Sequence, residues 1–229
     1  MEELLRTTAL IGEEGVEKLK SKKVIVIGIG GVGGYTCEAL ARTGVGQIDL
    51  VDSDVVSLSN INRQIIALHS TVGQKKVDAM KERINDINSD IIVNTYDMFV
   101  TENNLSTLNL SKYDYVVDAI DTVSSKIAIV ELCDKENIKV ISSMGAGNKL
   151  DPCAFKVSDI YKTAVCPLAK AVRVALKKKG IKKIKVVYSE ETPRVPAMEN
   201  GKRVPASCAF IPSVAGLIVA SEVIKDLIK

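Results

Sequence analysis

Apolar runs typical of strands alternate with helix-like patterns over the first two thirds of the chain. The strand-like runs lie near residues 23–28, 47–52, 91–96, 114–118 and 138–143. The helical patterns lie near residues 33–43, 74–87, 102–109 and 123–136. Because the runs are rich in Val and Ile and alternate little with polar residues, they are typical of parallel strands buried on both faces. The order of the elements predicts a doubly wound, mostly parallel α/β sheet.

The pattern changes after residue 147. Residues 155–158 and 185–188 are expected as later strands around a basic helix at 164–179, and residues 214–228 as a final helix. Between them, residues 190–207 contain three prolines, a glycine and mixed charges. Such a stretch is predicted as a loop, and as a mobile one. The 229 residues, 46% of them hydrophobic, suffice for one sizeable α/β core.

A glycine-rich segment follows the first predicted strand and includes Gly28, Gly30, Gly31 and Gly33. A turn of this kind lets backbone N–H groups contact a phosphate, which the positive end of the following helix stabilises. Asp52 ends the next apolar strand, where a carboxylate reaches a ribose hydroxyl. The segment predicts a Rossmann-like nucleotide site, but it does not separate dehydrogenases from methyltransferases or flavoproteins.

A polar cluster about thirty residues later departs from a dehydrogenase. Arg63 lies among Asn60, Asn62 and Gln64, and Lys76 follows 13 residues after the arginine. Arginine offers a planar fork of donors to a phosphoryl group, and lysine offers a mobile point charge. Together they are suited to binding the β and γ phosphates of ATP. Nicotinamide chemistry has no use for such phosphate-binding side chains.

One further carboxylate follows the predicted strand at 114–118. Asp121 is expected at the carboxyl edge of the sheet, where open α/β sheets bind their ligands. Magnesium in nucleotide sites is usually held by one or two carboxylates together with substrate phosphates. The sequence therefore predicts that Asp121 binds Mg²⁺.

These motifs resemble those of the E1-like (ubiquitin-activating) adenylating enzymes over nearly the whole chain. Four segments are most similar to the tRNA threonylcarbamoyladenosine dehydratase branch: residues 40–46, 60–68, 145–152 and 159–163. The resemblance implies a Rossmann-like, mostly parallel sheet with an antiparallel C-terminal extension. It implies one adenylation domain over residues 1–229.

The two halves of that domain would differ in role. Residues 1–150 would form the nucleotide-binding half. Residues 151–229 would form the substrate and dimer half, with the mobile loop 190–207 lying near the bound acyl group and ordering over it.

The resemblance implies an enzyme that uses ATP to cyclise the threonylcarbamoyl group on an adenosine of tRNA, releasing AMP and pyrophosphate. The substrate carboxylate would attack the α-phosphate of ATP, and a carbamoyl atom would then close a ring and expel AMP. Carried over to this sequence, the resemblance gives Gly30 and Gly31 to the phosphate loop, Asp52 to the ribose, Asp54 and Asn60 to the site floor, Arg63, Gln64 and Lys76 to the phosphates, and Asp121 to Mg²⁺.

The resemblance also implies partners. Arg6 matches an arginine that dimers of this superfamily send into the partner's ATP site, so a homodimer is expected in which Arg6 joins Arg63, Lys76 and Asp121 in catalysis. A monovalent cation, Na⁺ or K⁺, and a sulfur-transfer partner such as a cysteine desulfurase belong to the same expectation. The chain start lacks a secretion signal and no apolar run is long enough to span a bilayer, so a cytoplasmic location without a membrane partner is expected.

The net charge of +3 does not by itself indicate nucleic-acid binding. Residues 177–185, however, hold six lysines in nine positions, which predicts a contact with tRNA. The same lysines would also suit a helix C-terminus followed by the polar face of a strand. The sequence alone leaves both interpretations open.

The five cysteines form no C-x-x-C pair, so the zinc site of sulfur-carrier-activating relatives is missing. Cys37 and Cys133 fall in predicted helices and are expected in the core. Cys166 and Cys208 flank the predicted loop, where each would be either a catalytic thiol or a small buried hydrophobe.

Two other functions remain open on the sequence. One is an adenylyltransferase that activates the C-terminal diglycine of a ubiquitin-like sulfur carrier, which the missing zinc cysteines disfavour. The other is a nucleotide-binding module without turnover, which would have no need of Arg63, Lys76 and Asp121 together.

Overall fold

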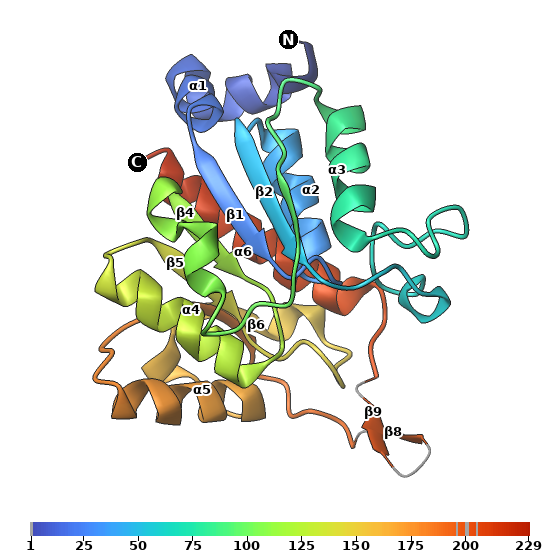
Figure 1. Ribbon diagram of the computed structural model, residues 1–229, viewed down its shortest axis with the longest axis vertical. Coiled ribbons are helices and arrows are strands. Elements are labelled where there is room, and N and C mark those ends of the chain that lie inside the picture. Colours follow the sequence, from blue (N-terminus) through green and yellow to red (C-terminus); the bar gives the residue numbers. More distant parts are fainter. Residues whose placement is uncertain (1, 196, 200–201, 205) are drawn as a thin grey trace.

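The computed structural model describes residues 2–195, 197–199, 202–204 and 206–229 (Figure 1). Seven strands form one sheet in the order β3-β2-β1-β4-β5-β7-β6, and every neighbouring pair is parallel except β6 with β7. The strands are β1 (Lys23–Ile27), β2 (Gln47–Asp52), β3 (Thr95–Asp97), β4 (Tyr115–Asp118), β5 (Val140–Ser143), β6 (Phe155–Asp159) and β7 (Lys185–Ser189). This confirms the predicted fold class, including its antiparallel end.

The central strand shows why these apolar runs form the middle of the sheet. In β1, Val24 and Val26 pack into one hydrophobic cluster, whereas Ile25 and Ile27 pack into another on the opposite face. All four are fully buried. Successive side chains of a strand point to opposite faces, so an uninterrupted apolar run serves two cores at once.

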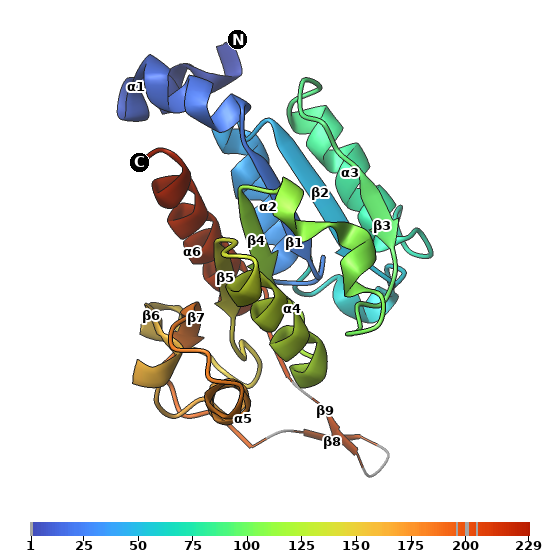
Figure 2. The same ribbon diagram turned by 60° about the vertical axis from the view of Figure 1, so that its left-hand side comes forward.

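Helices cover both faces (Figures 1 and 2). One cluster joins the sheet to α2, α3 and α6, and the other joins it to α4. The helices are α1 (Leu5–Lys20), α2 (Gly33–Thr43), α3 (Lys76–Ile87), α4 (Val123–Lys135), α5 (Pro167–Lys178) and α6 (Phe210–Leu227). No helix in the described part of the chain is long and apolar enough to cross a membrane.

Three local features differ from the sequence predictions. Helix α1 was not expected, because its two glycines and exposed acidic residues weaken the helical pattern, and it kinks at Gly12, whose φ is +78°. The helix predicted at 102–109 forms two 3₁₀ turns, Leu105–Leu108 and Leu110–Lys112, separated by Asn109 at a φ of +45°. Strand β3 is shorter than the predicted strand at 91–96 and ends one residue later.

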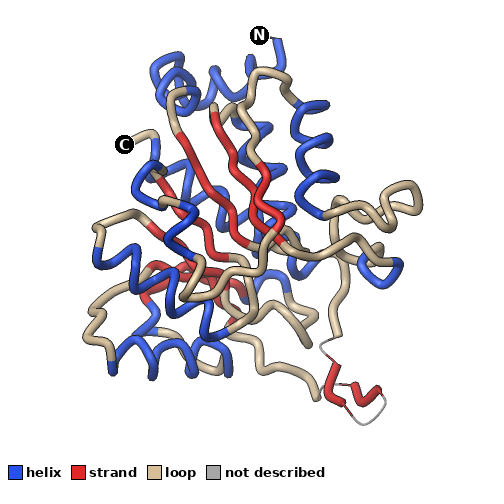
Figure 3. The backbone as a smooth tube through the Cα atoms, in the orientation of Figure 1, coloured by secondary structure: helices blue, strands red, loops and turns tan. Residues whose placement is uncertain are grey.

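The segment at 190–207 was predicted as a loop, but it contains a hairpin of β8 (Ala197–Glu199) and β9 (Lys202–Val204). The two strands pair only with each other and stand away from the seven-stranded sheet (Figure 3). Two three-residue strands leave too short a hydrophobic pattern to be recognised from sequence. Mobility of this segment stays a prediction.

Helix α6 begins at Phe210, upstream of the predicted start at residue 214. Pro212 lies in the first turn of this helix, where a missing N–H costs no hydrogen bond within the helix. Gly216 lets α6 approach α2 closely: a Cβ atom there would lie 2.3 Å from the Val32 carbonyl oxygen. The Thr36 hydroxyl of α2 donates to the Gly216 carbonyl oxygen at 3.1 Å. These contacts hold the start of α2, and with it the glycine loop, against α6.

Candidate active site

A cavity of about 490 Å³ opens at the carboxyl edge of the sheet. Its walls come from the ends of β1, β2 and β4, from the segment that follows β3, and from the start of α6. It is lined by these predicted site residues: Gly28, Gly30, Gly31, Asp52, Asp54, Asn60, Arg63, Gln64, Lys76 and Asp121. The predicted residues Gly33, Asn62 and Arg6 do not line it.

The glycine loop is shaped by close approach of backbone to backbone. Gly28 has a φ of +93°, and a Cβ atom there would lie 2.9 Å from the Ala119 carbonyl. Gly33 lies behind the loop, where a Cβ atom would come within 1.8 Å of the Gly28 carbonyl oxygen. Only glycine fits both positions, so the chain turns sharply from β1 into α2 and leaves the loop backbone facing the cavity.

Asp52, at the end of β2, holds this loop in place. Its Oδ2 atom accepts a hydrogen bond from the Ile29 N–H at 2.6 Å, and Oδ1 accepts one from the Asp54 N–H at 2.8 Å. Asp54 in turn forms an ion pair with Lys76, in which Nζ and Oδ2 are 2.7 Å apart. Lys76 is only 5% exposed, so it is not the solvated first-turn lysine that its position at the start of α3 would suggest.

The cluster at 60–64 forms a compact turn. Asn60 is buried, and its carbonyl oxygen accepts the N–H groups of Arg63 and Gln64 at 3.1 and 2.9 Å. The Arg63 Nη1 atom donates to the Ser59 carbonyl at 2.8 Å and to Asn62 Oδ1 at 2.9 Å. Asn62 therefore orients the arginine from outside the cavity. The guanidinium keeps further N–H donors for a ligand.

Asp121 is exposed at the cavity and forms no ion pair within the described residues. Those residues also hold no group of three or more side chains suited to a metal ion. A single carboxylate beside a phosphate site is the donor set typical of magnesium held mainly by nucleotide and water. Arg6 lies on α1, which precedes β1 and so sits at the opposite, amino edge of the sheet (Figure 1).

Sequence reasoning missed an apolar wall. Met98, Phe99 and Val100 follow β3 and line the cavity together with Val51 and Ile120. Phe99 is 57% exposed, so its ring is available to a ligand in the cavity. The detectable signal was the position of this apolar triplet directly after a strand end, where ligands of open sheets bind.

The last part of the hairpin-bearing segment also contributes to the cavity, through a residue that sequence reasoning did not single out. Ser207 lines the cavity, and its carbonyl oxygen accepts a hydrogen bond from Asn62 Nδ2 at 2.9 Å. Within the described residues, two buried side-chain oxygens have no hydrogen-bond partner, Gln64 Oε1 and Ser207 Oγ. Both belong to residues of this cavity. Buried polar atoms are rarely left unpaired, so the pair indicates a polar ligand here.

The base of that segment is held next to the cavity. Asn148 and Ala206 exchange two hydrogen bonds, at 2.7 and 2.9 Å. The Glu191 carboxylate accepts the N–H groups of Leu150 and Asp151 at 3.0 and 2.8 Å. The chain is therefore fixed on both sides of the hairpin, at Glu191 before it and at Ala206 after it, beside the nucleotide-sized cavity.

Comparison with known proteins agrees with this geometry, since the sequence profile of the ThiF family matches residues 3–229. The chain belongs to the ThiF family. A tRNA threonylcarbamoyladenosine dehydratase of Bacillus subtilis is 48% identical over an alignment that covers 98% of this chain and 94% of that protein. The resemblance inferred from the motifs is thereby confirmed.

Solved structures lead to the same branch of the ThiF family. A crystal structure of E. coli tRNA N6-threonylcarbamoyladenosine dehydratase, TcdA, in complex with ATP matches with a TM-score of 0.93 at 35% identity. That match covers 99% of this chain and 93% of the other. The same E. coli protein in complex with AMP matches with a TM-score of 0.91 at 35% identity, covering 97% and 92% of the two chains.

The cysteines differ in their surroundings. Cys37 and Cys133 are fully buried, as predicted, and burial raises the pKa of both thiols, that of Cys133 to about 12. Cys166 is also buried, at the start of α5, whereas Cys208 is half-buried and Cys153 exposed. The structure brings neither Cys166 nor Cys208 into the lining of the cavity.

The lysine-rich stretch runs from the end of α5 to the start of β7. Lys179 pairs with Glu131 at 2.6 Å, and Lys185 pairs with Asp226 at 2.5 Å. The other lysines of the stretch are exposed: Lys177, Lys178, Lys182 and Lys183. Because β7 runs parallel to β5, its first residue lies at the amino edge of the sheet, away from the cavity.

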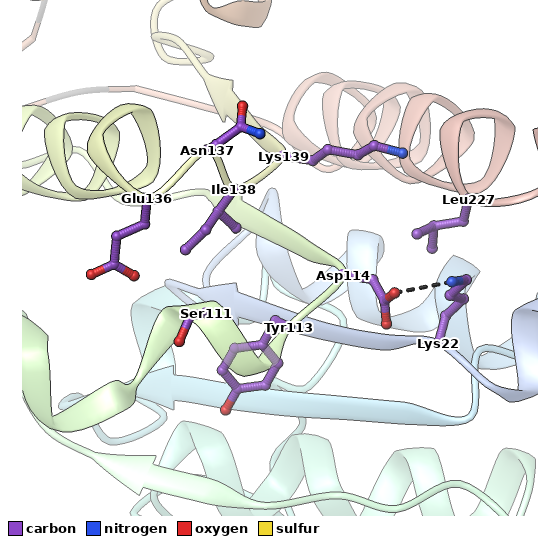
Figure 4. Close-up of a pocket in the computed structure, with 9 residues that line it drawn as sticks. All are labelled: Lys22, Ser111, Tyr113, Asp114, Glu136, Asn137, Ile138, Lys139 and Leu227. Carbon is purple, nitrogen blue, oxygen red and sulfur yellow. Dashed lines mark hydrogen bonds and ion pairs between the residues drawn. The ribbon is translucent and has the colours of Figure 1, made fainter.

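A second hollow of about 310 Å³ lies at that amino edge (Figure 4). Its floor carries an ion pair between Lys22 and Asp114, with Nζ and Oδ1 3.0 Å apart. Tyr113 and Lys139 also line it, but none of the predicted site residues does. Among the described residues, those predicted to bind the ATP phosphates are thus gathered at the carboxyl edge.

Proposed function

We propose that this chain is an ATP-dependent tRNA threonylcarbamoyladenosine dehydratase. It adenylates the carboxylate of the threonylcarbamoyl group and cyclises that group, with release of AMP and pyrophosphate. The observation that carries the proposal is the meeting of the glycine loop, Arg63, Lys76 and Asp121 in one cavity. The names of the B. subtilis and E. coli relatives supply the substrate.

The cavity suits ATP along its whole length. The apolar wall at Met98–Val100 would pack on the adenine, and Asp52 would accept a ribose hydroxyl, because a carboxylate oxygen accepts more than one hydrogen bond. The backbone of Gly30 and Gly31 would face the phosphates. Lys76 enters the site already oriented by Asp54.

Catalysis in this proposal rests on charge placement. Arg63 and Lys76 would stabilise the charge that gathers on the departing pyrophosphate. Asp121 would hold Mg²⁺, which supplies further positive charge at the phosphates when bound. In the family's pattern, Arg6 from the partner subunit adds a third side chain, and this makes the homodimer part of the catalyst. A Na⁺ or K⁺ site is proposed on the resemblance alone.

The chemistry balances without a protein nucleophile. A carboxylate oxygen attacks the α-phosphorus, the bond to the β-phosphate oxygen breaks, and an acyl-adenylate and pyrophosphate result. A carbamoyl atom of the same substituent then attacks the acyl carbon, loses a proton, and expels AMP. The oxygen lost from the carboxylate leaves within AMP, so the nucleoside loses one water in total.

The two unpartnered oxygens suit the acyl end of this substrate. Gln64 Oε1 is an acceptor and needs a donor, which a carbamoyl N–H or a hydroxyl supplies. The Ser207 hydroxyl can donate to a carboxylate. The 190–207 segment would then meet the acyl group through Ser207, and ordering of the hairpin over the substrate is part of this proposal.

The tRNA would contact the exposed lysines between α5 and β7, and these would bind its phosphates without reading sequence. Helix α5 has 12 residues, so its two ends are about 18 Å apart. A cytoplasmic location and docking of a cysteine desulfurase are proposed only from the family's pattern.

The test is the substrate requirement for pyrophosphate release. Purified protein with ATP and Mg²⁺ is given tRNA bearing threonylcarbamoyladenosine, the same tRNA lacking the modification, or a peptide ending in diglycine. Pyrophosphate release with the modified tRNA only is the expected result. Release with the diglycine peptide would instead favour the sulfur-carrier adenylyltransferase, and ATP binding without release under all three conditions would favour the non-catalytic module.

A further inference from the structure

A fully buried ion pair lies beneath the cavity. Lys126 and Asp118 have no exposed surface, and their Nζ and Oδ2 atoms are 2.8 Å apart. The Ser142 hydroxyl donates to the same Asp118 oxygen at 2.5 Å and accepts a hydrogen bond from Lys126 Nζ at 3.1 Å. Burying two charges carries a desolvation penalty, so such a pair is poor evidence for stability alone.

The three side chains come from three elements that each lead into the cavity wall. Asp118 ends β4, directly before the turn at 119–122. Ser142 lies in β5, four residues before Ala146, which lines the cavity together with Gly147. Lys126 lies in the first turn of α4. The network therefore joins three separate segments of one site.

The residues on both sides of Asp121 are held, one by this network and the other by the backbone at the start of α4. Asp118 Oδ1 accepts the Ile120 N–H at 3.3 Å, directly before Asp121. The Lys126 N–H donates to the Thr122 carbonyl at 3.0 Å, directly after it. The Asp121 side chain itself has no ion pair among the described residues, so its direction depends on how this turn is held.

The same first turn of α4 also fixes the apolar wall. The buried Ser125 hydroxyl donates to the Val100 carbonyl at 2.6 Å. Ser125 is the neighbour of Lys126, and both Ser125 and Val100 line the cavity. One helical turn thus connects the wall proposed for adenine to the carboxylate proposed for magnesium.

We propose that Lys126 is a positioning residue, which neutralises Asp118 and, with Ser142, holds the 119–122 turn so that Asp121 faces the nucleotide phosphates. The proposal rests on the nucleotide site proposed above, and not on the identity of the acyl substrate. Without the ammonium group, Asp118 must take up a proton or admit water, and its bond to Ile120 is no longer fixed.

Lys126→Met tests this, because methionine keeps the unbranched side chain and removes the charge. We expect about tenfold weaker ATP binding in the presence of Mg²⁺, and little change in EDTA, by calorimetry. Lys126→Arg should restore most of the loss. Combining Lys126→Met with Asp121→Asn should cause no further Mg²⁺-specific loss beyond Asp121→Asn alone, because the two act through one carboxylate.

The matched control is Lys185→Met, which breaks the ion pair with Asp226 far from the cavity. It should lower the melting temperature and leave the Mg²⁺ dependence of ATP binding unchanged. If Lys126→Met folds poorly, Ser142→Ala keeps the ion pair and should give a smaller loss of the same Mg²⁺-specific kind.

The proposal would be overturned if Lys126→Met lost the same ATP affinity with Mg²⁺ as with EDTA. It would also be overturned if the Mg²⁺-specific losses of ATP affinity in Lys126→Met and Asp121→Asn were additive. These readouts use only ATP and Mg²⁺. A wild-type protein that binds Mg²⁺ and ATP but does not dehydrate tRNA would refute the proposed function and leave this inference intact.

Discussion

Gly33 is the most tightly enclosed position of the glycine loop. A Cβ atom there would overlap the Gly28 carbonyl oxygen, at 1.8 Å. Gly30, by contrast, has open space: the nearest atom to a Cβ would be Gln64 Nε2, at 3.9 Å. The two glycines therefore serve different ends, since one permits the fold of the loop and the other leaves room at its surface.

Substituting these glycines by alanine should separate folding from binding. Gly33→Ala should destabilise the protein by about 3 kcal/mol, because the backbone must shift to accept the methyl group. For a chain of this size that lowers the melting temperature by about 10 °C. Gly30→Ala should melt as the wild type does, yet bind ATP more weakly. Equal melting temperatures for the two variants would contradict this account of the loop.

At the level of single residues, the sequence located the groups whose chemistry is distinctive. Arg63, Lys76 and Asp121 meet in the cavity as expected, because a glycine loop and strand ends already fix where ligands bind. Lys126 and Ser207 were not singled out as site residues from the sequence. A lysine in a helix is ordinary until its partner is known, and the Lys126–Asp118 pair is buried only because β4 and α4 pack together.

At the level of elements, the core strands β1, β2, β4 and β5 were predictable because each is a buried apolar run between turn signals. Helix α1 and the β8–β9 hairpin were not. Helix α1 buries only three residues, Gly15, Val16 and Leu19, and it is interrupted at Gly12. Tertiary packing outweighs local propensity in such elements, and a sequence pattern does not report it.

One contact between elements carries a prediction about pH. Lys185 of β7 reaches Asp226 of α6 at 2.5 Å, and Tyr115 and Lys229 also donate to that carboxylate. Burial alone would raise the pKa of Asp226, but the hydrogen bonds from Lys185, Lys229 and Tyr115 outweigh it and lower the pKa to about 2. The carboxylate is therefore stabilised by folding.

The stabilisation should be present above about pH 4, where the unfolded carboxyl is already ionised, and should be lost as pH falls toward 2. Asp226→Asn should thus have a lower melting temperature than the wild type at neutral pH. This gap in melting temperature should shrink as the pH falls from about 4 to about 2. Asp90→Asn, at an exposed position, should show no such gap. A gap for Asp226→Asn that is independent of pH would contradict this assignment.

At the level of the whole molecule, Arg6 cannot serve the cavity of its own chain from the amino edge of the sheet. If it acts in the partner's site, Arg6→Ala and Arg63→Ala should each lower turnover about a hundredfold. Mixing the two inactive variants should then restore up to about a quarter of the wild-type rate. Half of randomly reassorted dimers are mixed, and each mixed dimer has one intact site.

Complementation is measured after slow exchange of subunits, with each variant alone as the control. Recovery of activity in the mixture is the expected result. Failure of the mixture to exceed the two single variants, with dimers demonstrated by light scattering, would show that Arg6 does not act across the interface.

The most direct test of the central claim is mass spectrometry of nucleosides from tRNA bearing threonylcarbamoyladenosine, after incubation with the protein, ATP and Mg²⁺. The account predicts that the modified nucleoside loses the mass of one water, that the loss requires ATP, and that Arg63→Ala slows it about a hundredfold. An unchanged nucleoside, from a protein that still binds ATP, would contradict the account.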